Sequence, residues 1–172
     1  MELPARKPNR IKVYDYSQTG AYFITICTHE RKKLLSEISV GTAVPGCPQS
    51  SAHIQLLQHG EIADRYIRQM DAFYNHISVD NYVIMPDHIH LLLTVHGHDG
   101  QPGTAAPTGA ARRNSVIAQF VRTFKRFCNQ QYGENIWQRS YYDHVVRNKQ
   151  DYDETWEYIE HNPMKWLVTT ER

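Results

Sequence analysis

Two histidines separated by one residue, His88 and His90, open the apolar run HIHLLLTV. Side chains along a strand alternate between two faces, so this spacing places both imidazoles on the same face. Neutral imidazoles about 6 to 7 Å apart at Cα can bind one divalent ion together and leave its other coordination positions open. The alternative is that the two rings only satisfy hydrogen bonds near the end of a sheet. Two histidines are an incomplete metal site, so a third ligand is needed.

A helix is expected at about residues 152 to 162. Asp151 followed three residues later by Glu154 resembles a capping box, and Pro163 predicts the end of the helix. At about 100° per residue, three apolar or aromatic side chains fall on one stripe of this helix. They are Tyr152, Trp156 and Ile159.

Tyr158 and Asn162 form a second face of the same expected helix. Residues four apart lie one above the other, so an Asn162 oxygen that bound a metal would hold it close to the Tyr158 hydroxyl. This requires the helix to pack across the histidine face. A phenol with a pKa of about 10 is a poor nucleophile at neutral pH, but a metal bound to the phosphate under attack lowers the barrier. The chain has 11 tyrosines, and a packing role for Tyr158 is the alternative.

The remaining patterns predict the elements that must position these side chains. Residues 21–28, 76–85 and 88–95 are rich in β-branched and aromatic residues and predict strands, whereas helical periodicity is found within 58–76 and 114–130. Two segments rich in Gly, Pro and Ala, 39–53 and 97–113, predict mobile loops rather than domain linkers. With 172 residues and no repeat, residues 1–172 are expected to form a single domain.

Positive charge is concentrated in one part of the chain. Residues 110–150 contain eight lysines and arginines against two acidic residues, a net charge of +6 in a chain of net charge +1. Arg122, Lys125 and Arg126 lie off the apolar stripe of the helix expected within 114–130, which makes that helix basic on its outer face. Such a block is either a solvated surface or a surface that holds phosphates.

Other classes of protein are disfavoured by composition. Cys27, Cys47 and Cys128 are odd in number and lack metal-like spacing, which argues against a disulfide framework and a zinc site. No stretch approaches the roughly 20 apolar residues of a membrane span. We therefore expect no membrane association and a cytoplasmic location. The chain ends ten residues after Asn162, so no large C-terminal specificity element is expected.

Three segments in order, MPDHIH, WQRSYYDHVVRN and YIEHNPMKW, resemble the REP-associated tyrosine transposases, a family of single-tyrosine HUH transposases. The resemblance starts at YDYSQTGAYFITICTHERK and covers nearly the whole chain. It implies an α+β fold of the HUH-nuclease type, a ferredoxin-like antiparallel sheet with helices packed on it. It also implies that His88 and His90 bind Mg²⁺ or Mn²⁺, with Asn162 as a third ligand.

The same resemblance implies an activity. Tyr158 would attack a phosphate of single-stranded DNA, forming a 5′-phosphotyrosine link that a DNA 3′-hydroxyl can reverse, so that strands are nicked and rejoined. The implied partners are hairpin-forming repetitive palindromic DNA and single-stranded DNA, bound by a monomer or a homodimer. The residues expected to contact this DNA are Arg122, Lys125, Arg126, Arg139 and Arg147.

Several interpretations stay open from the sequence. The segment WQRSYY, with Arg139, is either a DNA contact or a packed strand with a surface arginine. His144 and Arg147 serve either phosphate contacts or structural bonds, and Asp87 either orders a metal-bound water or caps the turn after Pro86. The competing functions are a hairpin-binding protein that does not cleave and a metal phosphoesterase with no covalent step.

Overall fold

The computed structural model describes residues 18–41, 52–97 and 115–170. Four antiparallel strands form its main sheet in the order β4-β5-β1-β6. They are β1 (Gly20–Cys27), β4 (Ile77–Ile84), β5 (His88–Val95) and β6 (Tyr142–Val146). Helix α1 (Gln58–Phe73) lies between β1 and β4 in the chain, and α3 (Val116–Tyr132) between β5 and β6. This βαββαβ succession confirms the predicted α+β, ferredoxin-like fold.

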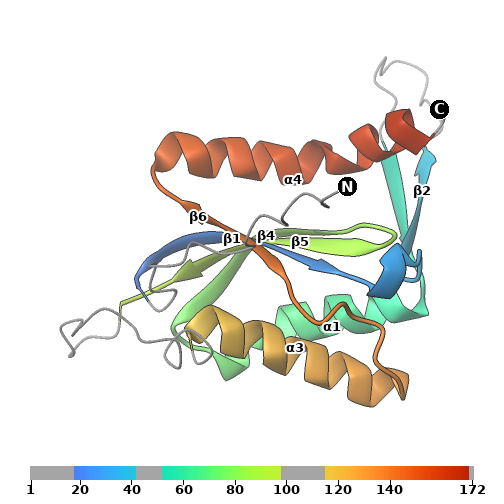
Figure 1. Ribbon diagram of the computed structural model, residues 1–172. Coiled ribbons are helices and arrows are strands. Elements are labelled where there is room, and N and C mark those ends of the chain that lie inside the picture. The colour runs from blue at the N-terminus through green and yellow to red at the C-terminus, as the bar shows by residue number, and fades with distance from the viewer. Residues whose placement is uncertain (1–17, 42–51, 98–114, 171–172) are drawn as a thin grey trace, which may run out of the picture.

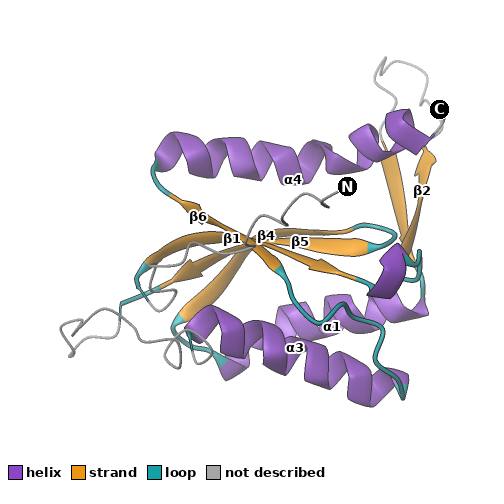
Figure 2. Cartoon of the chain, in the orientation of Figure 1, coloured by secondary structure: helices purple, strands orange, loops and turns teal. Residues whose placement is uncertain are grey.

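Helices cover both faces of the sheet (Figures 1 and 2). Helices α1 and α3 lie on one face, and α4 (Lys149–Thr170) lies on the other. Alternation along β5 assigns its side chains to these faces as predicted. Ile89, Leu91 and Leu93 are completely buried in the core under α1 and α3, whereas Leu92 belongs to a second core with Ile159 of α4.

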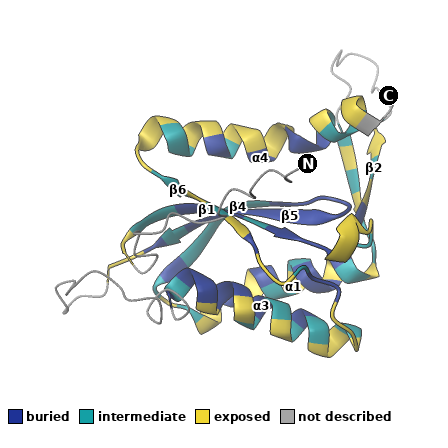
Figure 3. Ribbon diagram, in the orientation of Figure 1, coloured by how far each residue is buried: buried dark blue, intermediate teal, exposed yellow. Residues whose placement is uncertain are grey.

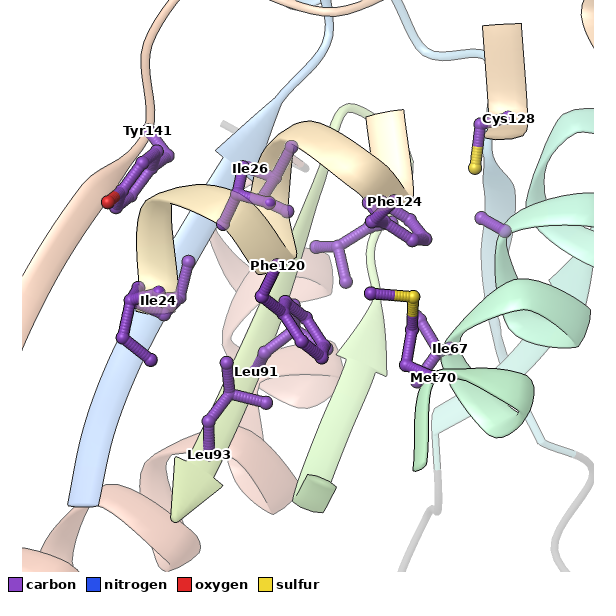
Figure 4. Close-up of a cluster of buried hydrophobic side chains, with 14 of the residues drawn as sticks. Ile24, Ile26, Ile67, Met70, Leu91, Leu93, Phe120, Phe124, Cys128 and Tyr141 are labelled. Carbon is purple, nitrogen blue, oxygen red and sulfur yellow. The ribbon is translucent and has the colours of Figure 1, made fainter. Parts of the chain in front are cut away.

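The core under α1 and α3 is filled by apolar side chains from all of these elements (Figure 4). Phe120 and Phe124 of α3 and Met70 of α1 are buried against Leu91 of β5. Ser115 caps α3 by accepting a hydrogen bond from the Ala118 N–H at 3.3 Å. Gly133 ends the helix at φ 78°, a left-handed conformation that favours glycine. These contacts hold the sheet from the face opposite α4.

Helix α4 does not end at Pro163, so the predicted end is wrong. The helix runs from Lys149 to Thr170 with Pro163 inside it. A proline in a helix removes one backbone hydrogen bond and costs about 3 kcal/mol. Here Asn162 and Pro163 are both buried, and Trp166, one turn further, packs on the core around Ile159. These tertiary contacts offset the cost and extend the helix.

The start of α4 also differs from the prediction. The Asn148 side chain accepts a hydrogen bond from the Asp151 N–H at 2.9 Å and thus caps the helix. Asp151 lies within the first turn, where its carboxylate accepts from the Arg147 N–H and contacts the His144 ring. Glu154 pairs with Gln150 instead of closing a capping box with Asp151. The capping residue is therefore three positions earlier than predicted.

A two-stranded hairpin lies beside the C-terminal part of α4 (Figure 1). It consists of β2 (Ser36–Val40) and β3 (Ala52–Leu56), so both ends of the loop predicted at 39–53 are strand. Ile38 and Ile54 pack on the core around Ile159, which explains why these ends are ordered as strand. Residues 42–51, and all but the first of the loop predicted at 97–113, lie outside the described residues. No described helix is long and apolar enough to cross a membrane.

Candidate active site

Strand β5 and helix α4 bring the four predicted site residues together. His88 and His90 point from the sheet toward α4, and Tyr158 and Asn162 point from α4 toward the sheet; all four line one pocket. We call it the histidine pocket. Its lining is completed by Thr25, Arg31, Lys165, Trp166 and Thr169. The predicted site requires the last helix to pack across the histidine face, and the structure confirms this packing.

The two histidines face each other through their Nε2 atoms, which are 3.1 Å apart. The Nδ1 of His88 is hydrogen-bonded to the Asp87 carboxylate, and the Nδ1 of His90 lies 2.9 Å from the Thr25 hydroxyl. Because a carboxylate accepts hydrogen bonds, the contact with Asp87 favours the His88 tautomer that carries its proton on Nδ1 and leaves a lone pair on Nε2. Burial, together with the neighbouring His88 and Arg31, lowers the pKa of His90 to about 3. His90 is thus neutral at physiological pH, the form that binds metals.

The Asp87 carboxylate contacts His88 and lies 3.5 Å from the Arg31 guanidinium, so its side chain does not cap the turn after Pro86. The alternative, that Asp87 orders a metal-bound water, stays a prediction. The backbone carbonyl of Asp87 accepts hydrogen bonds from the N–H and hydroxyl of Thr28. Asp87 therefore orients His88 while its backbone is tied to the end of β1.

Tyr158 lies in the pocket with its side chain partly open to solvent. The residue is 39% exposed, unlike Ile159, which is 1% exposed in the core below. Its ring makes edge contacts with Phe23, at 5.8 Å between ring centroids, and with His90, at 5.4 Å. The Lys165 ammonium lies 4.9 Å from the Tyr158 ring centroid. The phenol is thus positioned by aromatic neighbours yet accessible to a substrate.

Three cation-bearing or aromatic residues of this pocket were missed by sequence reasoning: Arg31, Lys165 and Trp166. Lys165 and Trp166 follow Tyr158 by seven and eight residues, which is the same helix face, but the predicted end at Pro163 excluded them. Arg31 has φ 56° and follows Glu30 at φ 55°, two left-handed residues after β1. Nothing in the sequence indicates that this bend turns Arg31 toward His88.

The donors of the histidine pocket fit a divalent metal ion. Two nitrogens that each lie about 2.1 Å from one ion at an angle of about 90° are roughly 3 Å apart, close to the observed separation. Oriented imidazoles with a carboxylate behind one of them are typical of metal-binding histidines. Among the described residues no group of three or more His, Cys, Asp or Glu is placed to hold a metal. Asn162 lines the same pocket and carries an amide oxygen, the donor expected from the sequence as a third ligand.

A second feature, the basic groove, lies between α3 and residues 138–142. Arg122, Lys125, Arg126 and Arg139 line it, so four of the five predicted DNA contacts share one surface. The Lys125 ammonium donates to the backbone carbonyls of Gln138 and Ser140, at 2.7 and 2.9 Å. Lys125 thus holds the far wall of the groove in place, which is a structural role that the sequence did not indicate.

Arg147 does not line the basic groove. It lies just after β6, where its backbone N–H donates to Asp151, and His144 contacts the same carboxylate. Of the two roles considered for His144, the one observed is therefore a structural hydrogen bond, to Asp151. In the WQRSYY segment, Trp137 is buried against Phe124 and the strand begins only at Tyr142. The segment is packed at its start and exposed at Arg139.

No family model matches the chain. A relative from Haemophilus influenzae, which its name assigns provisionally to the REP-associated tyrosine transposases, is 27% identical over 88% of this chain and 74% of its own length. The REP-associated tyrosine transposase of Escherichia coli is 23% identical over 87% of this chain and 70% of its own. Among solved structures, a REP-associated tyrosine transposase bound to a REP hairpin has a similar fold. It matches with a TM-score of 0.55 and 20% identity, over 91% of this chain and 72% of that one.

Proposed function

We propose that this chain, which belongs to the REP-associated tyrosine transposases, nicks and rejoins single-stranded DNA beside a hairpin through a covalent bond to Tyr158. The observation that carries the proposal is the histidine pocket, where Tyr158, Asn162 and the facing Nε2 atoms of His88 and His90 meet. A nucleophile and a metal-ligand set in one accessible pocket are what phosphoryl transfer requires. The chain thus has a transposase-like role, with this reaction as its chemistry.

In the nicking step, Tyr158 Oη forms a bond to the phosphorus as the bond to the 3′-oxygen of the preceding nucleotide breaks. The phenol loses its proton and the departing 3′-oxygen gains one, so the products are a free 3′-hydroxyl and a 5′-phosphotyrosine. The edge contacts with Phe23 and His90 restrain the Tyr158 ring. Less conformational entropy is therefore lost when the phenol reaches the reacting geometry. Rejoining is the reverse step, with a DNA 3′-hydroxyl as the nucleophile.

The other residues of the pocket hold the reacting groups in place. His88, His90 and Asn162 would bind Mg²⁺ or Mn²⁺, which when bound neutralises charge on the phosphate as the phenol attacks. Asp87 keeps the His88 ring oriented, and Thr25 does the same for His90. Arg31 and Lys165 line the same pocket and add positive charge that would favour binding of the phosphate.

The basic groove is proposed to hold the backbone of the hairpin. Arg122, Arg126 and Arg139 line it from α3 and from the segment before β6, and guanidinium groups bind phosphates well. The similar structure that is bound to a REP hairpin supports hairpin DNA as the partner. Tyr142, which lines the groove from β6, pairs with Thr25 of β1, which lines the histidine pocket. Neighbouring strands therefore contribute to both features, although α3 and α4 lie on opposite faces of the sheet (Figure 1).

The test is formation of a covalent protein-DNA adduct. Labelled hairpin DNA with single-stranded flanks is incubated with the protein in Mg²⁺ or Mn²⁺ and in EDTA, and the adduct is resolved on a denaturing gel. The native protein should form adduct only with metal, and Tyr158→Phe should form none while binding the hairpin as before. Tyr66→Phe is the control, since Tyr66 lies on α1, on the opposite face of the sheet from α4 (Figure 1), and it should form adduct as the native protein does.

Adduct formation by Tyr158→Phe would reject this tyrosine as the nucleophile. Binding without cleavage under every metal condition would favour the hairpin-binding protein that does not cleave. Cleavage that leaves no DNA on the protein would favour the metal phosphoesterase. His88→Ala and His90→Ala should abolish cleavage and largely spare hairpin binding, because most affinity comes from the basic surface.

A further inference from the structure

Trp166 is a large aromatic residue of the histidine pocket that has no role in the proposed nicking reaction. It lines the pocket from the part of α4 that follows Pro163. Its ring is tilted by 48° to that of His88, with 6.0 Å between centroids. The side chain packs on the core around Ile159 and is partly buried. A partly buried indole therefore lies next to one of the proposed metal ligands.

Positive charge surrounds this indole. The Lys33 ammonium lies 5.6 Å from the Trp166 ring centroid, Lys165 precedes Trp166, and Arg31 lines the same pocket. Lys33 and Arg31 are exposed, and neither comes from the basic groove. An aromatic face among cations is the combination with which proteins hold unpaired nucleotides, since the ring stacks on a base and the cations contact the phosphates.

The charge on α4 restricts the direction from which DNA can approach. Before Pro163 the outer face of the helix is largely exposed (Figure 3) and carries four exposed acids. They are Asp153, Glu154, Glu157 and Glu160. Lys149 pairs with Asp153, but the face keeps an excess of negative charge, which repels a phosphate backbone. The route into the histidine pocket is therefore past Arg31, Lys33 and Trp166, at the other end of the helix.

We propose that Trp166 and Lys33 form a subsite in which an unpaired DNA base next to the scissile phosphate stacks on the indole. The Lys33 ammonium now lies over the ring at the place such a base would take, and its four-carbon chain lets it move to a neighbouring phosphate when the base enters. A base held in a duplex cannot reach this position without leaving its stack. The subsite thus selects unpaired DNA, and it tolerates any sequence because every base has a stacking face. The proposal rests on the nicking function proposed above.

The test measures equilibrium binding, so that it does not depend on cleavage. In a Tyr158→Phe background, Kd is measured by fluorescence anisotropy for a hairpin with single-stranded flanks, and for a series in which one flanking nucleotide at a time is abasic. Trp166→Ala should weaken binding of the intact DNA by about five-fold or more. At one flanking position, an abasic nucleotide should weaken binding to the protein that retains Trp166 by the same factor as Trp166→Ala does. In Trp166→Ala, the same abasic nucleotide should cause no further loss of affinity.

Two further variants separate stacking from structural damage. Trp166→Phe keeps an aromatic face and should recover most of the affinity lost in Trp166→Ala. Phe73→Ala removes an exposed aromatic ring from α1, on the opposite face of the sheet, and should leave every Kd unchanged (Figure 1). Additive effects of Trp166→Ala and the abasic site at every flanking position would overturn the proposal. Coupling in this binding assay, together with no adduct formation by the native protein in the adduct assay above, would leave the subsite standing and reject the nicking function.

Discussion

The contact between Asp87 and His88 makes a sharp prediction about metal affinity. Asp87→Asn keeps the shape of the side chain and removes its charge, while the backbone carbonyl still accepts from Thr28. Asp87→Ala also removes the acceptor behind His88 Nδ1. The Arg31 contact at 3.5 Å adds little, because the Arg31 side chain is 51% exposed and solvent screens the pair. Any large effect must therefore pass through the orientation and basicity of His88.

Loss of a group that orients a metal-binding histidine typically reduces metal affinity by about 10- to 100-fold. We expect Asp87→Asn near the lower value, because an amide oxygen can still accept from Nδ1–H, and Asp87→Ala near the upper one. These changes correspond to about 1.4 and 2.7 kcal/mol of binding free energy. Mn²⁺ is the suitable probe, since imidazole nitrogens bind it more strongly than they bind Mg²⁺.

The measurement is a titration of each protein with Mn²⁺ in the absence of DNA, with free Mn²⁺ quantified by electron paramagnetic resonance. Asp64→Asn is the control, because Asp64 pairs with Arg68 and Tyr82 on the α1 side of the chain. It should leave the Mn²⁺ Kd unchanged. An unchanged Kd in Asp87→Ala would refute the assigned role of Asp87, and absence of Mn²⁺ binding to the unmodified protein would refute the metal site itself.

Three further outcomes follow from the structure. Ile159→Ala, at a residue that is 1% exposed between α4 and the sheet, should lower the free energy of unfolding in urea by about 2–5 kcal/mol; a loss below about 1 kcal/mol would show that α4 is not anchored there. The Arg147 N–H and His144 lower the pKa of Asp151 below 3.8, so its stabilising effect is present above that pH and lost as the pH falls through the folded-state pKa. Asp151→Asn should thus lower Tm at pH 7 but not near pH 2, and a pH-independent difference in Tm would contradict this linkage. Arg122→Ala with Arg126→Ala should weaken hairpin binding and reduce the slope of log Kd against log salt by about one to two, whereas Arg65→Ala on α1 should not; an unchanged slope would show that the basic groove does not hold phosphates.

Local periodicity in the sequence determined which residues share a face. The period of two along 88–95 placed His88, His90 and Leu92 together and Ile89, Leu91 and Leu93 opposite, because successive strand side chains must alternate. The period of a helix likewise placed Tyr158 above Asn162. These relations depend only on backbone geometry within one element, so they hold in whatever fold the element joins.

Tertiary contacts decided what the pocket contains besides those four residues. Proline is a helix-ending signal when only neighbours in the chain are considered, yet α4 continues because Pro163 is buried and Trp166 packs beyond it. That continuation brings Lys165 and Trp166 to the site. Arg31 reaches the pocket through a left-handed bend after β1, and the turn that carries Asp87, the partner of His88, is tied to Thr28 at the end of β1. Each of these outcomes depends on contacts between segments far apart in the chain. The energies of such contacts cannot be predicted from local patterns in the sequence.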